Sequence, residues 1–230
     1  MLIIADKKIP DEAKSNLRKF GELVLLETSG ITEESISGHP DIFFCKTPEI
    51  LIVAPNIPDN YKNVLSEKNI SFVEGRFPVG MKYPGAARYN AVITNDFIIH
   101  RTDITDPSVS EYCKRCQRIY VRQGFTRCSL LPLKDGHFIT SDTGISKVLT
   151  SKGLCVLHVS SKDIFLPGYT HGFFGGACGI FENKLFVIGN FNNYCDGEKV
   201  KLFINSLGYE VVELYDGQLF DGGSIIFIPQ

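Results

Sequence analysis

The sequence predicts an α/β fold in which five units of the order strand, strand, helix, strand form a five-fold pseudo-symmetric propeller. One observation is a pattern of that order that recurs every roughly 40–48 residues. A second is that each end of the chain supplies only part of one further unit. Both are explained if the N- and C-terminal segments pair and close a ring, which leaves no exposed sheet edge. The alternative is a doubly wound α/β domain, which does not explain the partial unit at each end.

The first unit is divided between the two ends of the chain. Apolar residues predict strands at 2–5 and 23–27, and a helix at 10–20 lies between them. The missing first strand is expected at 224–228. Together the five units predict a single domain over residues 1–230, with units at about 1–30 plus 219–230, 39–75, 86–121, 125–160 and 172–214.

Turn and cap residues divide the second and third units. Strands are expected at 51–54 and 70–73, with a helix start at Pro58 and Asp59 between them. The third unit has strands at 91–94, 97–100 and 119–121, and Asp106 followed by Pro107 is typical of a helix N-terminus.

The fourth and fifth units are the most regular. The fourth has strands at 128–133, 137–140 and 154–159, an Asp135-Gly136 turn, and a helix at 143–150 that ends before Gly153. The fifth has strands at 177–181, 185–188 and 209–214. Its helix carries apolar residues at helical spacing and ends before Gly208; these are Val200, Phe203, Ile204 and Leu207.

Composition restricts the function classes. The chain has 26 acidic and 24 basic residues, a net charge of −2. This balance lacks the excess of basic residues that polyanion binding requires, and so it disfavours nucleic-acid binding. No apolar run approaches the ~20 residues that span a bilayer, and Asp6, Lys7 and Lys8 interrupt any signal peptide. Seven cysteines at scattered spacings suit reduced thiols. We expect a cytoplasmic protein without membrane or nucleic-acid partners.

Several segments resemble the pentein superfamily, the guanidino-group modifying α/β propellers that include arginine deiminase, agmatine deiminase, dimethylarginine dimethylaminohydrolase and the amidinotransferases. The segment 39–44, HPDIFF, is similar to the family's Pro-Asp-x-Val-Phe-Val segment, and 208–212 with 221–224 resembles its last helix exit and closing strand. Residues 172–179 and the ending DGGSII resemble a bacterial family of this fold with no assigned activity. Residues 89–100 also resemble the non-enzymatic branch, the ribosome anti-association translation initiation factor.

The resemblance implies a catalytic cysteine and histidine, and this chain departs from both. The position of the nucleophile falls on Gly222, Gly223, Ser224 or Ile226, and no cysteine follows Cys195. The segment that would hold the histidine reads FTRC, at 125–128.

Two acidic positions of the enzymes are also changed. The Glu-Asp after the first motif is Cys45-Lys46, and the Gly-Gly-Asp of the second unit is Arg88-Tyr89-Asn90. Either change would weaken the hold on a guanidinium. The resemblance therefore implies the fold and argues against the hydrolase reaction.

A relocated thiol is one alternative. Cys128, His171 and Cys178 lie near the starts of first strands, at the end of each unit that faces the central channel of such propellers, and a cysteine with a histidine and a nearby arginine can form a reactive thiolate. The other interpretation is that Cys128 and Cys178 are ordinary buried cysteines.

The favoured hypothesis is a catalytically diverged protein that binds a small polar metabolite in the central channel. The ligand is guanidino, amino-acid or anionic in type, and the excess of arginines over carboxylates favours an anion or zwitterion. The third alternative is a macromolecule-binding module like the anti-association factor. The candidate ligand-binding residues are Asp41, Arg88, Asn90, Arg127, His171 and Ser224.

We expect no cofactor and no metal. Cys113 and Cys116 form a Cys-x-x-Cys in a predicted helix, but two further zinc ligands at matching spacing are not evident. The loop at 74–84, rich in glycine and proline, is either a lid over the channel or a plain connection.

Overall fold

The computed structural model describes residues 1–229 and contains five three-stranded sheets and one two-stranded sheet within that range. Each three-stranded sheet has the same order: its middle strand is antiparallel to the first strand and parallel to the third. The predicted α/β fold is therefore confirmed, and the doubly wound alternative is wrong because the strands form separate mixed sheets.

The units follow the predicted order of elements. In the order first strand, middle strand, helix, third strand, the elements are β17 (Ile226–Ile228), β1 (Leu2–Asp6), α1 (Asp11–Leu17), β2 (Glu22–Leu26); β3 (Phe44–Lys46), β4 (Leu51–Val53), α3 (Asp59–Glu67), β5 (Phe72–Glu74); β6 (Val92–Ile93), β7 (Phe97–His100), α4 (Pro107–Tyr112), β8 (Gln117–Tyr120); β9 (Leu130–Pro132), β10 (His137–Thr140), α6 (Thr143–Ser151), β11 (Cys155–His158); and β13 (Cys178–Phe181), β14 (Lys184–Val187), α7 (Gly197–Ser206), β15 (Glu210–Glu213).

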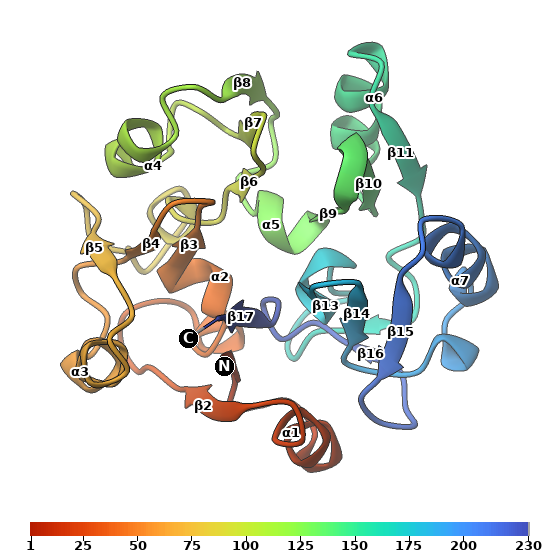
Figure 1. The fold of residues 1–230 in the computed structure, drawn as a ribbon, viewed down its shortest axis with the longest axis horizontal. Coiled ribbons are helices and arrows are strands. Elements are labelled where there is room, and N and C mark those ends of the chain that lie inside the picture. Colours follow the sequence, from red (N-terminus) through yellow and green to blue (C-terminus); the bar gives the residue numbers. More distant parts are fainter. Residues whose placement is uncertain (230) are drawn as a thin grey trace.

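The two ends of the chain meet in one sheet, as predicted. Strand β17 pairs antiparallel with β1, with Leu2 opposite Ile228 and Ile4 opposite Ile226. Figure 1 shows the sheets arranged around the middle of the molecule, with α1, α3, α4, α6 and α7 on the outside. Short helical segments, α2 (Pro40–Phe43) and α5 (Thr126–Ser129), lie near the middle.

Apolar strand residues make the core. All five residues of β1 are buried, and so are the three of β17, because the central sheets are covered on both faces. Helix starts follow local signals: the Asp106 side chain accepts from the Ser108 amide at 3.0 Å, and the Asp142 side chain accepts from the Ile145 amide at 2.8 Å.

Some predicted boundaries are wrong. Residues 126–129 form α5, so the strand expected from Cys128 begins only at Leu130, and the strand expected from Ser224 begins at Ile226. Helix α4 ends at Tyr112, so Cys113 and Cys116 lie after the helix rather than inside it. A small parallel sheet of β12 (Ile164–Phe165) and β16 (Leu219–Phe220) was not predicted.

None of the helices in the described part of the chain is long and apolar enough to cross a membrane.

Candidate functional site

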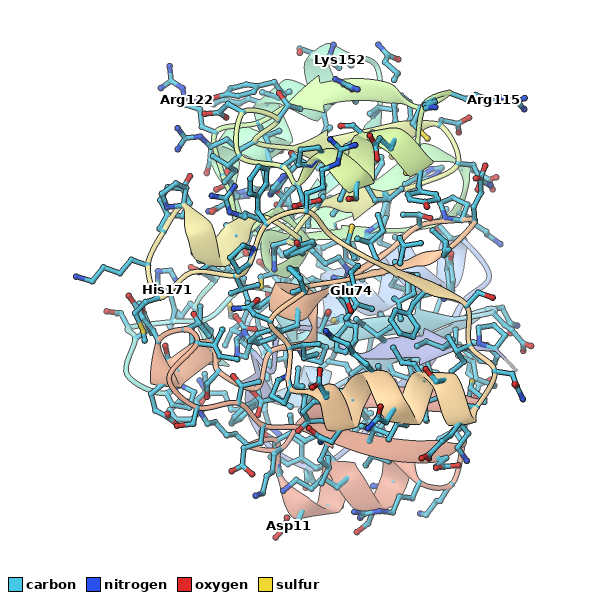
Figure 2. All side chains as sticks on the ribbon, turned by 90° about the vertical axis from the view of Figure 1, so that its left-hand side faces the viewer. Asp11, Glu74, Arg115, Arg122, Lys152 and His171 are labelled. Atoms are coloured by element: carbon cyan, nitrogen blue, oxygen red, sulfur yellow. The ribbon has the colours of Figure 1, made fainter. Side chains whose placement is uncertain are left out.

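Two cavities lie on opposite sides of the molecule. The first, which we call the hairpin-side cavity, has a volume of about 380 Å³ and is lined by Asp41, Arg127 and Ser224 and by the turns after β3 and β6. The second, which we call the loop-side cavity, has a volume of about 310 Å³ and is lined by His39, Tyr169 and His171 and by other residues of the segments that connect the units. Figure 2 shows His171 of the loop-side cavity at the left edge of the molecule. Arg115, which lies beside Pro48 and Asn95 of the other cavity, is at the right edge.

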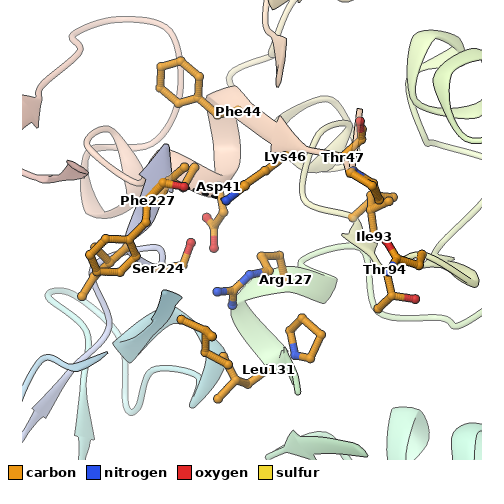
Figure 3. A pocket seen from close by; sticks show the side chains of 17 residues that line it. Asp41, Phe44, Lys46, Thr47, Ile93, Thr94, Arg127, Leu131, Ser224 and Phe227 are labelled. Atoms are coloured by element: carbon orange, nitrogen blue, oxygen red, sulfur yellow. Dashed lines mark hydrogen bonds between the residues drawn. The ribbon is translucent and has the colours of Figure 1, made fainter. Parts of the chain in front are cut away.

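Polar side chains from three units meet at the hairpin-side cavity. Asp41 comes from α2, Arg127 from α5 and Ser224 from the turn before β17, and Figure 3 shows all three pointing toward the same space. Lys46, at the end of β3, lies beside them and donates to the Phe227 carbonyl at 2.6 Å. Ile226, one of the positions where the enzymes' nucleophile would fall, also lines the cavity.

The charged groups of this cavity are held in place. The Arg127 guanidinium donates to the carbonyls of Gly175 at 2.9 Å and Cys178 at 3.3 Å. Burial raises the pKa of Asp41, while the hydrogen bond from Cys128 and the charge of Arg127 act in the opposite direction. Asp41 Oδ1 and Ser224 Oγ are buried and make no hydrogen bond of regular geometry, although the Ser224 hydroxyl lies close enough to Asp41 to lower its pKa. Buried polar groups with so few partners favour a bound polar molecule.

Asn90 fixes the segments that carry these residues. Its Oδ1 accepts from the amides of Arg127 at 2.7 Å and Cys128 at 3.2 Å, and its Nδ2 donates to the Asp41 carbonyl at 3.1 Å. Asn90 is fully buried and is absent from the residues lining the two cavities. Its place in the structure is that of a positioning residue.

The loop-side cavity is mostly apolar and has polar groups at its base. Met81, Tyr83 and Tyr169 line its walls, and His39, Cys128 and Asp221 are buried at its base. The connection at 74–84 therefore covers this second cavity and not the hairpin-side one. Asp221 accepts from the amides of Phe173 at 2.8 Å and Gly223 at 3.1 Å, and burial raises its pKa to about 7.

The three candidate catalytic residues do not form an activated set. The Cys128 thiol donates to Asp41 Oδ2 at 3.0 Å, and burial raises its pKa well above the ordinary value. Burial also raises the pKa of the Cys178 thiol, and Cys178 is not among the residues lining the loop-side cavity. His171 lines that cavity with Cys128, but its ring contacts Phe173 and the Gly172 carbonyl.

One further predicted site residue, Arg88, lies away from both cavities. Arg88 lies with its guanidinium 5.2 Å from the centre of the Phe77 ring, and it is not among the residues that line either cavity. The expected excess of arginines over carboxylates is therefore not found at the centre, where Arg127 faces Asp41 and Asp221.

The buried thiols lead to a labelling prediction. With the folded protein at neutral pH, we expect a small electrophile to modify the exposed Cys155 and Cys195 first, and Cys128 and Cys178 far more slowly, because a thiol that is buried and protonated is a poor nucleophile. Mass spectrometry of the labelled peptides over time measures the order. Labelling of Cys128 faster than the exposed pair would contradict it and favour the relocated-thiol hypothesis.

Comparisons with known proteins agree with the fold. A family model described as "Family of unknown function (DUF6873)" matches residues 4–226. No curated protein gave a significant match. Similar solved structures include an amidinotransferase of the saxitoxin biosynthetic pathway from Microseira wollei, with 12% identity and a TM-score of 0.55 over 92% of this chain and 87% of that one.

Two further structures have the same fold. A mutant of dimethylarginine dimethylaminohydrolase from Pseudomonas aeruginosa, complexed with citrulline, has 10% identity and a TM-score of 0.56 over 92% of this chain and 91% of that one. The agmatine deiminase of C. jejuni has 12% identity and a TM-score of 0.55 over 93% of this chain and 74% of that one. The chain thus has the fold of the guanidino-modifying pentein enzymes.

The sequence did not identify several residues of the site. His39 and Asp221 lie in segments that resemble pentein motifs but were not predicted as site residues, and Lys46 was considered only as the replacement of a carboxylate. A signal was present for Lys46, because the strand that follows Asp41 places it on the same cavity. Asp6 had no signal, since its burial at the end of β1 depends on the pairing of the chain ends.

Proposed function

The chain belongs to the family of unknown function DUF6873, and from this premise we propose that it is a catalytically diverged pentein that binds a small anionic or zwitterionic metabolite in its hairpin-side cavity. The observation that carries the proposal is a cavity of about 380 Å³ in which Arg127 and Lys46 lie beside the buried Ser224 hydroxyl. A cavity of this size fits a small metabolite.

We also infer that the five units form one domain, a five-fold pseudo-symmetric ring closed by β1 and β17. The repeated strand order and the pairing of the chain ends support this arrangement. In such a ring the first strand of every unit starts near the axis, so the hairpin-side cavity is one mouth of the central channel.

The charged side chains of the cavity favour an anionic or zwitterionic ligand. Lys46 and Arg127 give the cavity two cations against the single carboxylate of Asp41. A ligand carboxylate near Lys46 would form a charge-assisted hydrogen bond, while Asp41 Oδ1 and Ser224 Oγ remain for a hydroxyl or ammonium of the same ligand. A purely cationic guanidino compound would be repelled by both cations.

The same residues argue against turnover by the enzymes' chemistry. The resemblance places the nucleophile at Gly222, Gly223, Ser224 or Ile226, and the segment that would hold the histidine reads FTRC, at 125–128, so neither catalytic residue is present. Burial keeps the nearby thiol of Cys128 protonated. A site that has cations and lacks the nucleophile is suited to binding.

A thermal-shift panel tests the proposal. Amino acids and small carboxylates are expected to raise the melting temperature by several degrees, because a ligand present at 100 times its Kd adds ~2.7 kcal/mol of stability. Lys46→Met should lose the shift, whereas Lys152→Met, a change at the exposed end of α6, should keep it. Stabilisation by a guanidino cation alone, or by no compound of the panel, would contradict the proposal.

A further inference from the structure

His39, Asp41 and Cys128 form a buried cluster of three metal-ligating side chains between the two cavities. Each offers one ligand atom, and the three atoms lie within 4.8 Å of one another. The side chains come from two segments far apart in the chain, since Asp41, two residues after His39, is 87 residues from Cys128, and all three are at most 3% exposed. The fold brings nitrogen, oxygen and sulfur donors together at one point.

Two of these residues have incomplete hydrogen bonding. His39 Nδ1 and Asp41 Oδ1 are buried and make no hydrogen bond of regular geometry among residues 1–229, although the Asp221 backbone interacts with His39 and the Ser224 hydroxyl interacts with Asp41. Incomplete hydrogen bonding of a buried polar atom costs free energy, and a bound cation would reduce that cost.

The donor atoms of the cluster suit a metal ion. The neutral imidazole of a histidine is the form that binds metals. The Cys128 thiol carries a proton that it donates to Asp41. Binding of a divalent ion to the sulfur would displace this proton to solvent, as thiolate coordination requires.

Groups of both charge types surround the cluster. Arg127 lies close enough to interact with both Asp41 and Cys128 and opposes a second cation. Asp221 interacts with Asp41 and Cys128, and Asp6 Oδ2 lies 3.9 Å from His39 Nε2. The carboxyl groups of Asp221 and Asp6 favour a cation at the cluster when they are ionised.

We propose that His39, Asp41 and Cys128 bind a zinc ion whose fourth coordination position opens to the loop-side cavity. A set of one imidazole, one carboxylate and one thiolate is typical of Zn²⁺, while the sulfur disfavours Mg²⁺ and Ca²⁺. His39 and Cys128 line the loop-side cavity, so water or a ligand donor atom can reach the open position from there. The site shares Asp41 with the proposed function, but its open position faces the opposite cavity and Lys46 is not one of its ligands.

Cobalt binding tests the site directly. Metal-free protein without an affinity tag is titrated with Co²⁺, and we expect one equivalent to bind with a near-ultraviolet thiolate-to-cobalt charge-transfer band. Cys128→Ser should remove the band and weaken binding at least tenfold. Cys116→Ser, which removes the most accessible cysteine of the Cys-x-x-Cys pair, should leave the band and the affinity unchanged.

A second variant allows the site to be tested even if the first variant does not fold. If Cys128→Ser does not fold, His39→Gln, which keeps the thiol, should bind Co²⁺ at least tenfold more weakly than the wild type. Absence of the charge-transfer band in wild-type protein, or a band that is lost in Cys116→Ser and kept in Cys128→Ser, would overturn the proposal. Lys46→Met should not alter cobalt binding, so failure of this site and failure of the proposed function are distinguishable.

Discussion

Replacement of Gly223 by alanine is expected to destabilise the protein by about 4 kcal/mol, the largest effect that we predict for a single methyl group. Gly223 has a φ of +64°, a conformation that residues with a Cβ rarely adopt. A Cβ at this position would lie 2.1 Å from His39 Cβ and 2.6 Å from His39 Cα, which cannot move without the backbone. The strain would fall on the buried centre of the molecule.

The position matters because it connects the C-terminal segment of the first unit to the second unit. The Gly223 carbonyl accepts from the Asp41 amide at 3.1 Å, and Gly223 precedes Ser224 at the cavity. Gly30→Ala is the matched control: its φ is +71°, but no atom lies within 4 Å of the added Cβ, so its cost should be about 1 kcal/mol. Denaturant unfolding of both variants measures the difference. Equal costs would show that the packing around Gly223 differs from that described.

Acid is expected to destabilise the protein through His100. This histidine is fully buried in the third unit, where Nε2 lies 2.7 Å from the Gly124 carbonyl and Nδ1 lies 2.7 Å from Thr105 Oγ1. Since a carbonyl only accepts, Nε2 carries the proton of the neutral ring. Burial lowers the pKa of His100 from its ordinary value of 6.5 to about 4.

The sign of the effect follows from proton linkage. Between pH 6.5 and 4 the unfolded chain binds a proton at His100 that the folded chain does not, so stability falls with decreasing pH, by up to about 3 kcal/mol from this residue. His100→Gln should remove that part of the loss, while the exposed His158→Gln should keep it. Unfolding free energies at pH 7, 5.5 and 4.5 give the comparison. The same pH dependence in wild type and His100→Gln would contradict the assignment.

Local signals in the sequence were sufficient for most elements of the fold. Asp106 before Pro107, the Asp135-Gly136 turn and Gly153 mark boundaries that the structure has, because caps and turns depend on neighbouring residues alone. The short helical segments α2 and α5 were not predicted. They are four residues long, and contacts such as the one from the Asp41 amide to Gly223 hold them. No local pattern encodes such contacts.

The site could be predicted only in part for the same reason. Asp41, Arg127 and Ser224 were identified from their places in the repeated units, and they meet at one cavity. The meeting of His39 with Cys128 depends on how two distant units pack, so their spacing in the sequence carried no metal signature. Arg88 is an example of a residue that was predicted to lie at the site and does not. It aligns with the Gly-Gly-Asp motif of the enzymes, but its guanidinium lies over the Phe77 ring.

The central claim is that Lys46 and Arg127 make the hairpin-side cavity a site for a small anion or zwitterion. Calorimetric titration with the most strongly stabilising carboxylate tests it most directly, using wild type, Lys46→Met and Lys152→Met. We expect Lys46→Met to raise the Kd by about 10- to 100-fold, as the loss of a hydrogen bond to a charged group predicts, and Lys152→Met to leave it unchanged. The same Kd for all three proteins would contradict the claim.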